Sequence, residues 1–217
     1  MITNTECNHD FLASLLVMST KYKVQALRKD AIRELSKLYP FPPSSHPLNY
    51  NSTASTPSIC AVITASNKAK AEIMVPMAYY YLAIRPLTEI FLAHDGDRLN
   101  ILLARDKLKD KQRALLMNSH SERCCRCSAK CFRSWNDFIH SEAQRGLREG
   151  LNVFSWSSER CPPGVCRRFK FNLAEYIRGS QELLWSELPT YFGLRTWQEL
   201  RDASNLEDWR LVSYSDV

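Results

Sequence analysis

The sequence predicts a mainly α-helical fold, a bundle-like array of helices, and three observations support this class. The chain has 217 residues, of which 45% are hydrophobic, enough to build one core, or one core with a small satellite. It has only six glycines against ten prolines, which leaves few residues for the positive-φ turns that strand-rich folds use repeatedly. Apolar residues also recur at three- and four-residue steps along most of the chain, which is the period of an amphipathic helix.

Two packed helices are predicted at the start of the chain, over residues 10–39. The helical period is carried by Phe11, Leu12, Leu15, Leu16, Met18, Val24, Leu27, Ala31, Leu35 and Leu38. We place the joint between the helices near Thr20 to Lys23. Asp10 is suited to cap the first helix, and Pro40 should end the second, because the residue before a proline is disfavoured in the α region.

Residues 40–58 hold five prolines and seven Ser/Thr with no charged side chain, which predicts a linker or long surface loop. From residue 59 the helical pattern returns, with Pro76 and Pro86 at helix starts. The most apolar window, 73–93, is interrupted by prolines and charged residues, so we interpret it as buried helices and expect no membrane partner.

Further on, Asp97 is suited to cap a helix that runs through Leu115. A last long helix is predicted from Phe171 to Leu188, broken by Pro189, with inward positions at Tyr176, Ile177, Leu183, Leu184 and Trp185. The aromatic residues that follow, up to Leu200, are interpreted as a turn and short helix folding onto the core; an exposed partner-binding patch is the alternative. The chain is thus divided into residues 1–39, the linker 40–58, a helical region 59–200 and a tail 201–217.

Six of the eight cysteines fall within residues 124–166. Cys124 and Cys127 form a C-x-x-C pair, Cys131 follows, and Cys161 and Cys166 form a second pair with four residues between them. Four thiolates around one ion make a closed structural zinc site, so these five cysteines are the candidate zinc ligands. Cys125 and His120 are spare candidates. Two other interpretations stay open: the cysteines are reduced, partly buried thiols, or the C-x-x-C pair is redox-active.

The net charge of +6 is concentrated in residues 101–180, which carry 16 Lys/Arg against 8 Asp/Glu. This surplus allows an alternative function, a zinc-stabilised nucleic-acid-binding module. We do not favour it, because arginines beside a zinc-thiolate site and solvated helix faces also explain the charge.

No catalytic function is predicted, since the five histidines lie in no catalytic motif and no Gly-rich phosphate loop is present. The N-terminal residues lack the pattern of a secretory signal, so we expect an intracellular protein of the cytoplasm or nucleus.

Residues 10–40 resemble the closing helices of BTB/POZ domains through Leu15, Leu16, Lys21, Tyr22, Val24, Leu27, Arg28 and Leu35. The remainder resembles the helical C-terminal region of the large BTB-domain families of mushroom-forming fungi. Ala104, Arg105 and Leu108 match a G-R-x-x-L-like helix, and the most specific match is at Trp185, Leu188, Pro189, Phe192, Gly193, Leu194 and Trp197.

The resemblance implies a non-catalytic adaptor or regulatory protein that binds other proteins. In such families the BTB domain homodimerises and sometimes recruits a cullin-type ubiquitin ligase or transcriptional regulators. The resemblance also implies that the strands and helices of the BTB dimer, roughly 80 to 100 residues, belong upstream of Met1. We therefore expect a truncated chain, with homo-oligomerisation through the missing portion.

Overall fold

The computed structural model describes residues 6–40, 54–118, 131, 133–141 and 165–204. Within these ranges the chain is helical and contains no strand, which confirms the mainly α-helical class. The helices are α1 (Glu6–Lys21), α2 (Gln25–Leu38), α3 (Thr56–Lys68), the 3-10 turn η1 (Glu72–Met74), α4 (Val75–Ala83), α5 (Leu87–Ile90), α6 (Asp95–Asn118), α8 (Arg167–Tyr191) and α9 (Trp197–Ala203). A further short helix covers residues 133–141.

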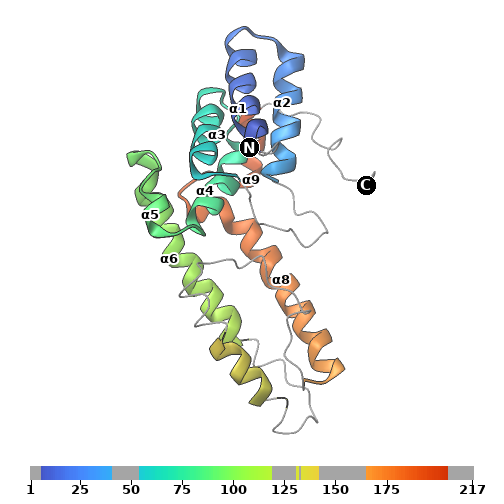
Figure 1. Cartoon of the computed structure of the whole chain (residues 1–217). Helices are drawn as coiled ribbons and strands as arrows, with labels where there is room; N and C mark the ends of the chain where they lie inside the picture. The colour runs from blue at the N-terminus through green and yellow to red at the C-terminus, as the bar shows by residue number, and fades with distance from the viewer. Residues whose placement is uncertain (1–5, 41–53, 119–130, 132, 142–164, 205–217) are drawn as a thin grey trace.

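The helices α1 and α2 form an antiparallel hairpin, and α1 packs against both α2 and α3 (Figure 1). The turn falls at residues 22–24, as predicted, and α2 ends at Leu38, two residues before Pro40. The helix α3 begins at Thr56, inside the segment predicted as linker. The Ser55 hydroxyl caps it by accepting from the Ser58 N–H at 3.3 Å.

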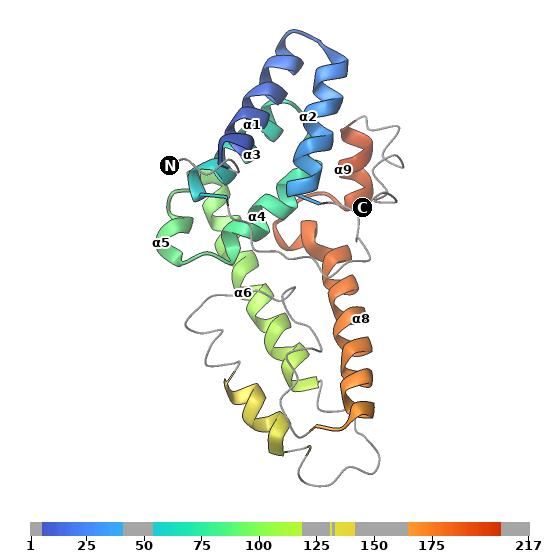
Figure 2. The same ribbon diagram turned by 45° about the vertical axis from the view of Figure 1, so that its right-hand side comes forward.

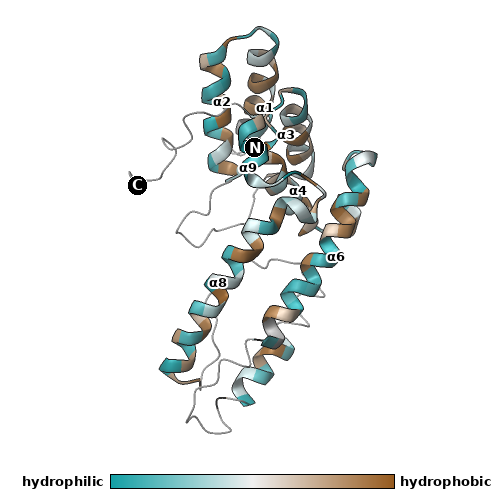
Figure 3. Cartoon of the chain, turned by 180° about the vertical axis from the view of Figure 1, so that it is seen from behind, coloured by the Kyte–Doolittle hydropathy of each residue, from teal (hydrophilic) through white to brown (hydrophobic). Residues whose placement is uncertain are grey.

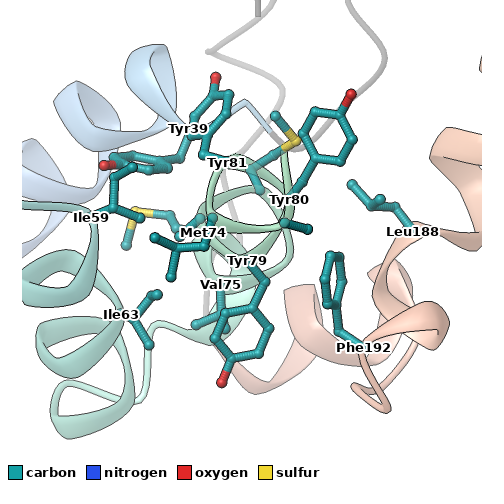
Figure 4. Close-up of a cluster of buried hydrophobic side chains, with 14 of the residues drawn as sticks. Tyr39, Ile59, Ile63, Met74, Val75, Tyr79, Tyr80, Tyr81, Leu188 and Phe192 are labelled. Atoms are coloured by element: carbon teal, nitrogen blue, oxygen red, sulfur yellow. The ribbon is translucent and has the colours of Figure 1, made fainter. Parts of the chain in front are cut away.

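The helix α4 lies at the centre of the molecule, and all nine of its residues are buried. Pro76 is in its first turn, and Pro86 directly precedes α5, so both prolines start helices as predicted. Figure 4 shows the tyrosines of α4 among side chains from α3, η1 and α8 and from the residues that directly follow α2 and α8. The Tyr81 hydroxyl donates to the Leu38 carbonyl at 3.1 Å, and the Tyr79 hydroxyl donates to the Asp97 carboxylate. Residues 73–83 are therefore buried in the protein core, as we inferred, whereas Leu87, Phe91 and Leu92 in the rest of the window are exposed.

Two long helices, α6 and α8, run antiparallel away from this centre (Figures 1 and 2). In Figure 3, apolar and polar bands alternate along both helices, because each has one face that packs and one that meets solvent. The chain then turns at Gly193 and returns as α9. The Trp197 indole stacks on Trp185 with ring centroids 5.5 Å apart, and its N–H donates to the Trp185 carbonyl at 2.7 Å.

This packing confirms that the aromatic end of the chain belongs to the core. Leu188, Phe192 and Leu200 have no exposed surface, and Trp185 is buried. The short helix α9 starts with a capping box, in which Thr196 and Glu199 satisfy each other's backbone N–H groups. The Arg195 guanidinium and the Glu72 carboxylate, 2.7 Å apart, tie this end to η1.

Four local predictions were wrong. Asp97 does not cap α6, because the helix begins at Asp95 and Asp97 lies within its first turn. Asp10 does not cap α1, because the helix begins at Glu6 and includes Asp10 as an exposed residue. Pro189 does not break α8, which continues to Tyr191: the Trp185 carbonyl, which an N–H at residue 189 would have bonded, accepts from the Trp197 indole instead. Leu183 does not point inward: it is 57% exposed, because Leu184, Trp185 and Leu188 define the buried face.

Candidate functional site

Two of the five candidate zinc ligands lie in the described part of the chain. Cys131 is buried one turn before Trp135, and Cys166 is half-buried at the N-cap of α8. The Cys166 sulfur accepts a hydrogen bond from the Phe169 backbone N–H at 3.4 Å. Cys124, Cys127 and Cys161 lie outside the described residues, as do the spare candidates Cys125 and His120.

An aromatic contact brings the surroundings of these two cysteines together. The Trp135 ring lies 5.4 Å from the Phe169 ring and also stacks on Phe138 at 5.1 Å. Cys131 is one helical turn from Trp135, and Cys166 is one turn from Phe169, so both cysteines flank the same contact between the 133–141 helix and α8. Within the described ranges, no group of three or more metal-ligating side chains is found. A closed structural zinc site needs four ligands, and two of the candidate cysteines lie beside this contact.

The described histidines do not come together. His9 is buried in α1, and its Nδ1 lies 3.1 Å from the Tyr39 hydroxyl, with the two rings edge to face. Burial lowers the pKa of His9 and raises the pKa of Tyr39, so both groups stay neutral at pH 7. The pair holds the start of α1 against the end of α2. His94 and His140 are exposed, and His46 lies outside the described residues.

Cys60 is the third described cysteine, half-buried in α3. Burial raises the pKa of its thiol, and the charge of Asp97 adds to this effect. A thiol that stays protonated is a poor nucleophile and a poor metal ligand. Cys60 is therefore a packing residue of α3, outside the 124–166 cysteine cluster.

The basic stretch of α6 is balanced by neighbouring carboxylates. Lys109 pairs with Asp106 at 3.7 Å, Arg113 pairs with Asp110 at 3.3 Å, and Lys111 reaches Glu187 of α8 at 3.6 Å. Exposed pairs of this kind contribute little energy, but they neutralise charge that a nucleic acid would otherwise contact. This face of α6 has the character of a solvated helix surface.

A more distinctive feature is an apolar stripe on the outside of α1 and the first residue after it, which we define as Phe11, Leu15, Met18 and Tyr22. Phe11 is 62% exposed, Met18 49% and Tyr22 63%, while Leu15 is half-buried. The opposite flank of α1 supplies Leu12 and Leu16 to the core. The sequence marked these positions as apolar, but it could not tell which of them would meet solvent, since that depends on where α2 and α3 pack.

A second group of exposed apolar side chains lies on α5, the turn after it and the first half of α6. It consists of Leu87, Phe91, Leu92, Leu99 and Leu103. The Arg98 guanidinium sits over the Phe91 ring, 5.4 Å from its centroid, and donates to the Phe91 carbonyl at 2.8 Å. Arg98 thus covers part of this group and fixes the turn between α5 and α6.

Among the described residues, none of the helices combines the length and the apolar composition that a membrane span needs.

Compared with known proteins, the chain matches no family model, no curated protein and no solved structure.

Proposed function

We propose that the protein is a non-catalytic protein–protein interaction protein that self-associates through the outer face of α1. The observation that supports this is the exposed stripe of Phe11, Leu15, Met18 and Tyr22. A contiguous apolar surface of this kind is costly in water and is typical of interaction sites. The motif resemblance to the helical C-terminal region of fungal BTB-domain families points to the same class of function.

The spacing of the stripe favours a second copy of the chain as its partner. Its members follow one another at four, three and four residues, which is the a/d pattern of a coiled-coil seam. The spacing is the same from either end of the stripe. Two copies of α1 can therefore pack antiparallel, with Phe11 facing Tyr22 and Leu15 facing Met18 of the partner copy. A two-fold symmetric interface requires a self-complementary patch of this kind.

Charge selects the antiparallel orientation. Lys21 and Lys23 lie at the end of α1, and Asp10 lies near its start. A parallel pair would bring the basic ends of two copies together, whereas an antiparallel pair places each basic end near the Asp10 end of the other copy. Four side chains from each copy bury less than the roughly 1,000 Å² of a standard interface, so we expect a dissociation constant in the micromolar range or weaker.

Sedimentation equilibrium of the full chain, from ~1 µM to ~1 mM, tests this proposal. We expect a monomer–dimer equilibrium that the double substitution Phe11→Glu with Met18→Glu weakens by at least about tenfold for each residue, since it puts charge into an apolar seam. Leu99→Glu is the matched control, because Leu99 is equally exposed but lies on α6. A wild-type chain that stays monomeric throughout, or a double variant that dimerises like the wild type, would refute the proposal.

We also propose a structural zinc ion held by cysteines from the set Cys124, Cys127, Cys131, Cys161 and Cys166. Support comes from the C-x-x-C spacing and from the positions of Cys131 and Cys166 beside the Trp135–Phe169 contact. Zinc would fasten the 133–141 helix to the start of α8. Metal analysis of untagged protein should give about one zinc per chain, and a chelator should lower the melting temperature. A zinc content near zero, with stability unaffected by chelator, would contradict the site.

A further inference from the structure

Two turns in the structure put a lysine where the backbone favours glycine. After α1, the Val24 N–H donates to the Ser19 carbonyl at 2.9 Å and the Lys23 N–H to the Thr20 carbonyl at 3.2 Å. After α3, the Ala71 N–H donates to the Ser66 carbonyl at 2.8 Å, and Lys70 makes the equivalent bond to Asn67 at 3.3 Å. Both turns are Schellman motifs, and their central residues have φ values of 58° for Lys23 and 52° for Lys70.

A third Schellman motif in the same chain uses glycine at this position. After α8, the Leu194 N–H donates to the Pro189 carbonyl at 3.0 Å, and Gly193, with φ of 69°, donates to Thr190 at 3.1 Å. Left-handed backbone is disfavoured for residues with a Cβ atom. Among the described residues, the motifs that end α1 and α3 carry lysine at this position, and left-handed residues with a Cβ atom are a starting point for a hypothesis of function.

The two strained turns lie at the same end of the molecule. The Arg28 guanidinium in the first turns of α2 donates to the Ala69 carbonyl at 3.2 Å, which joins the α1–α2 turn to the turn after α3. Lys68 and Lys70 flank Ala69, and Lys29 follows Arg28. We call this end of the molecule the basic tip and define it as Lys21, Lys23, Arg28, Lys29, Lys68 and Lys70.

The cations of the basic tip have no carboxylate partners. The five lysines are exposed and Arg28 is half-buried, and none of the six forms an ion pair within the part of the chain that the structure describes. This contrasts with α6, where Lys109, Lys111 and Arg113 are paired. Asp30, which is close in sequence, is held by Arg33 at 2.5 Å. The five exposed lysine charges of the single chain therefore remain available to a ligand, while Arg28 holds the two turns together.

Apolar side chains are exposed beside these charges. Tyr22, Val24 and Leu27 are 63%, 41% and 45% exposed, and the Lys21 ammonium lies 5.6 Å from the centroid of the Tyr22 ring. Figure 1 shows the α1–α2 turn projecting at the top of the molecule, so these side chains sit on a protruding end.

We propose that the basic tip docks the protein on an anionic phospholipid membrane surface. Lysine is a compact charge on a flexible stem, suited to a diffuse layer of lipid headgroups, whereas arginine is preferred where one phosphate or carboxylate is gripped in a fixed geometry. Val24 and Leu27, which lie outside the α1 stripe, find a partner at the boundary between headgroups and acyl chains, which a nucleic-acid duplex does not offer them. This inference departs from our expectation of no membrane partner, which rested on the lack of a spanning segment. Surface docking needs no such segment.

Vesicle sedimentation with the full chain tests the proposal. We expect binding to vesicles in which about a third of the lipid is phosphatidylserine, little binding to phosphatidylcholine alone, and loss of binding as salt shortens the Debye length from ~30 Å to ~8 Å. The double variant Lys23→Gly with Lys70→Gly should lower the partition coefficient by about fivefold for each lysine. Its melting temperature should be unchanged or higher, because glycine relieves the left-handed strain. Weaker binding by an equally stable variant cannot be ascribed to unfolding.

Lys107→Gln with Lys170→Gln is the control, since both lysines are exposed on α6 and α8 and the net charge falls by the same amount. This control should bind vesicles like the wild type. Equal binding to neutral and anionic vesicles, or equal loss in the control and the glycine variant, would overturn the proposal. The proposal would also be overturned if the chain did not bind vesicles but bound poly-glutamate or duplex DNA through Lys23 and Lys70. The partner would then be an acidic protein or a nucleic acid. The stripe variant Phe11→Glu with Met18→Glu tests self-association separately.

Discussion

Arg105 offers the sharpest test of how the centre of the fold is held together. Its side chain is only 7% exposed, and its guanidinium donates to the carbonyls of Ala83 and Arg85, just where α4 ends. The last carbonyls of a helix have no partner within the helix, so Arg105 of α6 satisfies the C-terminal end of α4. Arg105→Met keeps the length of the side chain and removes both donors.

The expected loss follows from these two bonds. Hydrogen bonds from a charged donor are worth about 1.5–3 kcal/mol each, which sets an upper limit of about 6 kcal/mol. Part of this is offset, because burial disfavours the charged form and lowers the pKa of Arg105, and because its Nε has no hydrogen-bond partner in the described part of the chain. We therefore expect Arg105→Met to lower the free energy of unfolding by about 2–4 kcal/mol, and Arg105→Lys to recover part of it.

Urea unfolding followed by far-UV circular dichroism measures this difference. With a slope of about 2–3 kcal/mol/M, the midpoint of Arg105→Met should fall by about 1 M. Lys107→Met is the control: Lys107 is exposed two residues further along α6, and its substitution should leave the midpoint nearly unchanged. Replacing buried charges by apolar residues is sometimes neutral or stabilising. If Arg105→Met were as stable as the wild type, capping of α4 by Arg105 would not be a net stabilising interaction.

Three further predictions concern helix ends and pH. Gly193→Lys should destabilise the chain by about 1–2 kcal/mol through its backbone alone, since a Cβ at this position meets nothing within 4 Å; unchanged urea stability would show that left-handed backbone carries no cost in this motif. Thr196→Ala should cost about 1 kcal/mol by removing the cap of α9, and Thr196→Ser should be nearly neutral; an equal loss in both variants would mean that the hydroxyl is not what stabilises the helix. Burial lowers the pKa of His9, so the unfolded chain binds a proton more readily than the folded one. Stability should therefore be full above pH ~6.5 and fall below it, and melting curves between about pH 7.5 and pH 5 should show a smaller drop for His9→Gln than for the wild type. An equal drop in both would place the sensitive group elsewhere.

The helical class and many helix boundaries could be predicted from local chemistry. Prolines at 40, 76 and 86 act through their own φ angle and missing N–H, whatever surrounds them, and all three mark helix ends or starts as expected. The same reasoning failed for Asp10, Asp97 and Pro189, because a helix can begin before an aspartate and can include a proline in its last turn. A proline in the last turn removes few hydrogen bonds, and an aspartate inside a helix needs no capping role.

The surfaces proposed to carry function could be predicted only in part. Helical periodicity identified Phe11, Leu12, Leu15, Leu16 and Met18 together, because an apolar arc this wide covers both the packed and the open side of a helix. Packing against α2 and α3 then buried Leu12 and Leu16 and left Phe11 and Met18 in solvent. The basic tip could not be predicted from the sequence, because its lysines are far apart along the chain. Glycine, which usually marks left-handed backbone, is also missing from both turns.

The full burial of α4 has a consequence for how the protein opens. A nine-residue helix is too short to persist alone, and α4 contacts α3, η1, α5 and α6 while its tyrosines reach residues of α2 and α6. Its backbone amides can exchange with solvent only when all of these neighbours separate. Hydrogen exchange in α4 should therefore report the global free energy of unfolding.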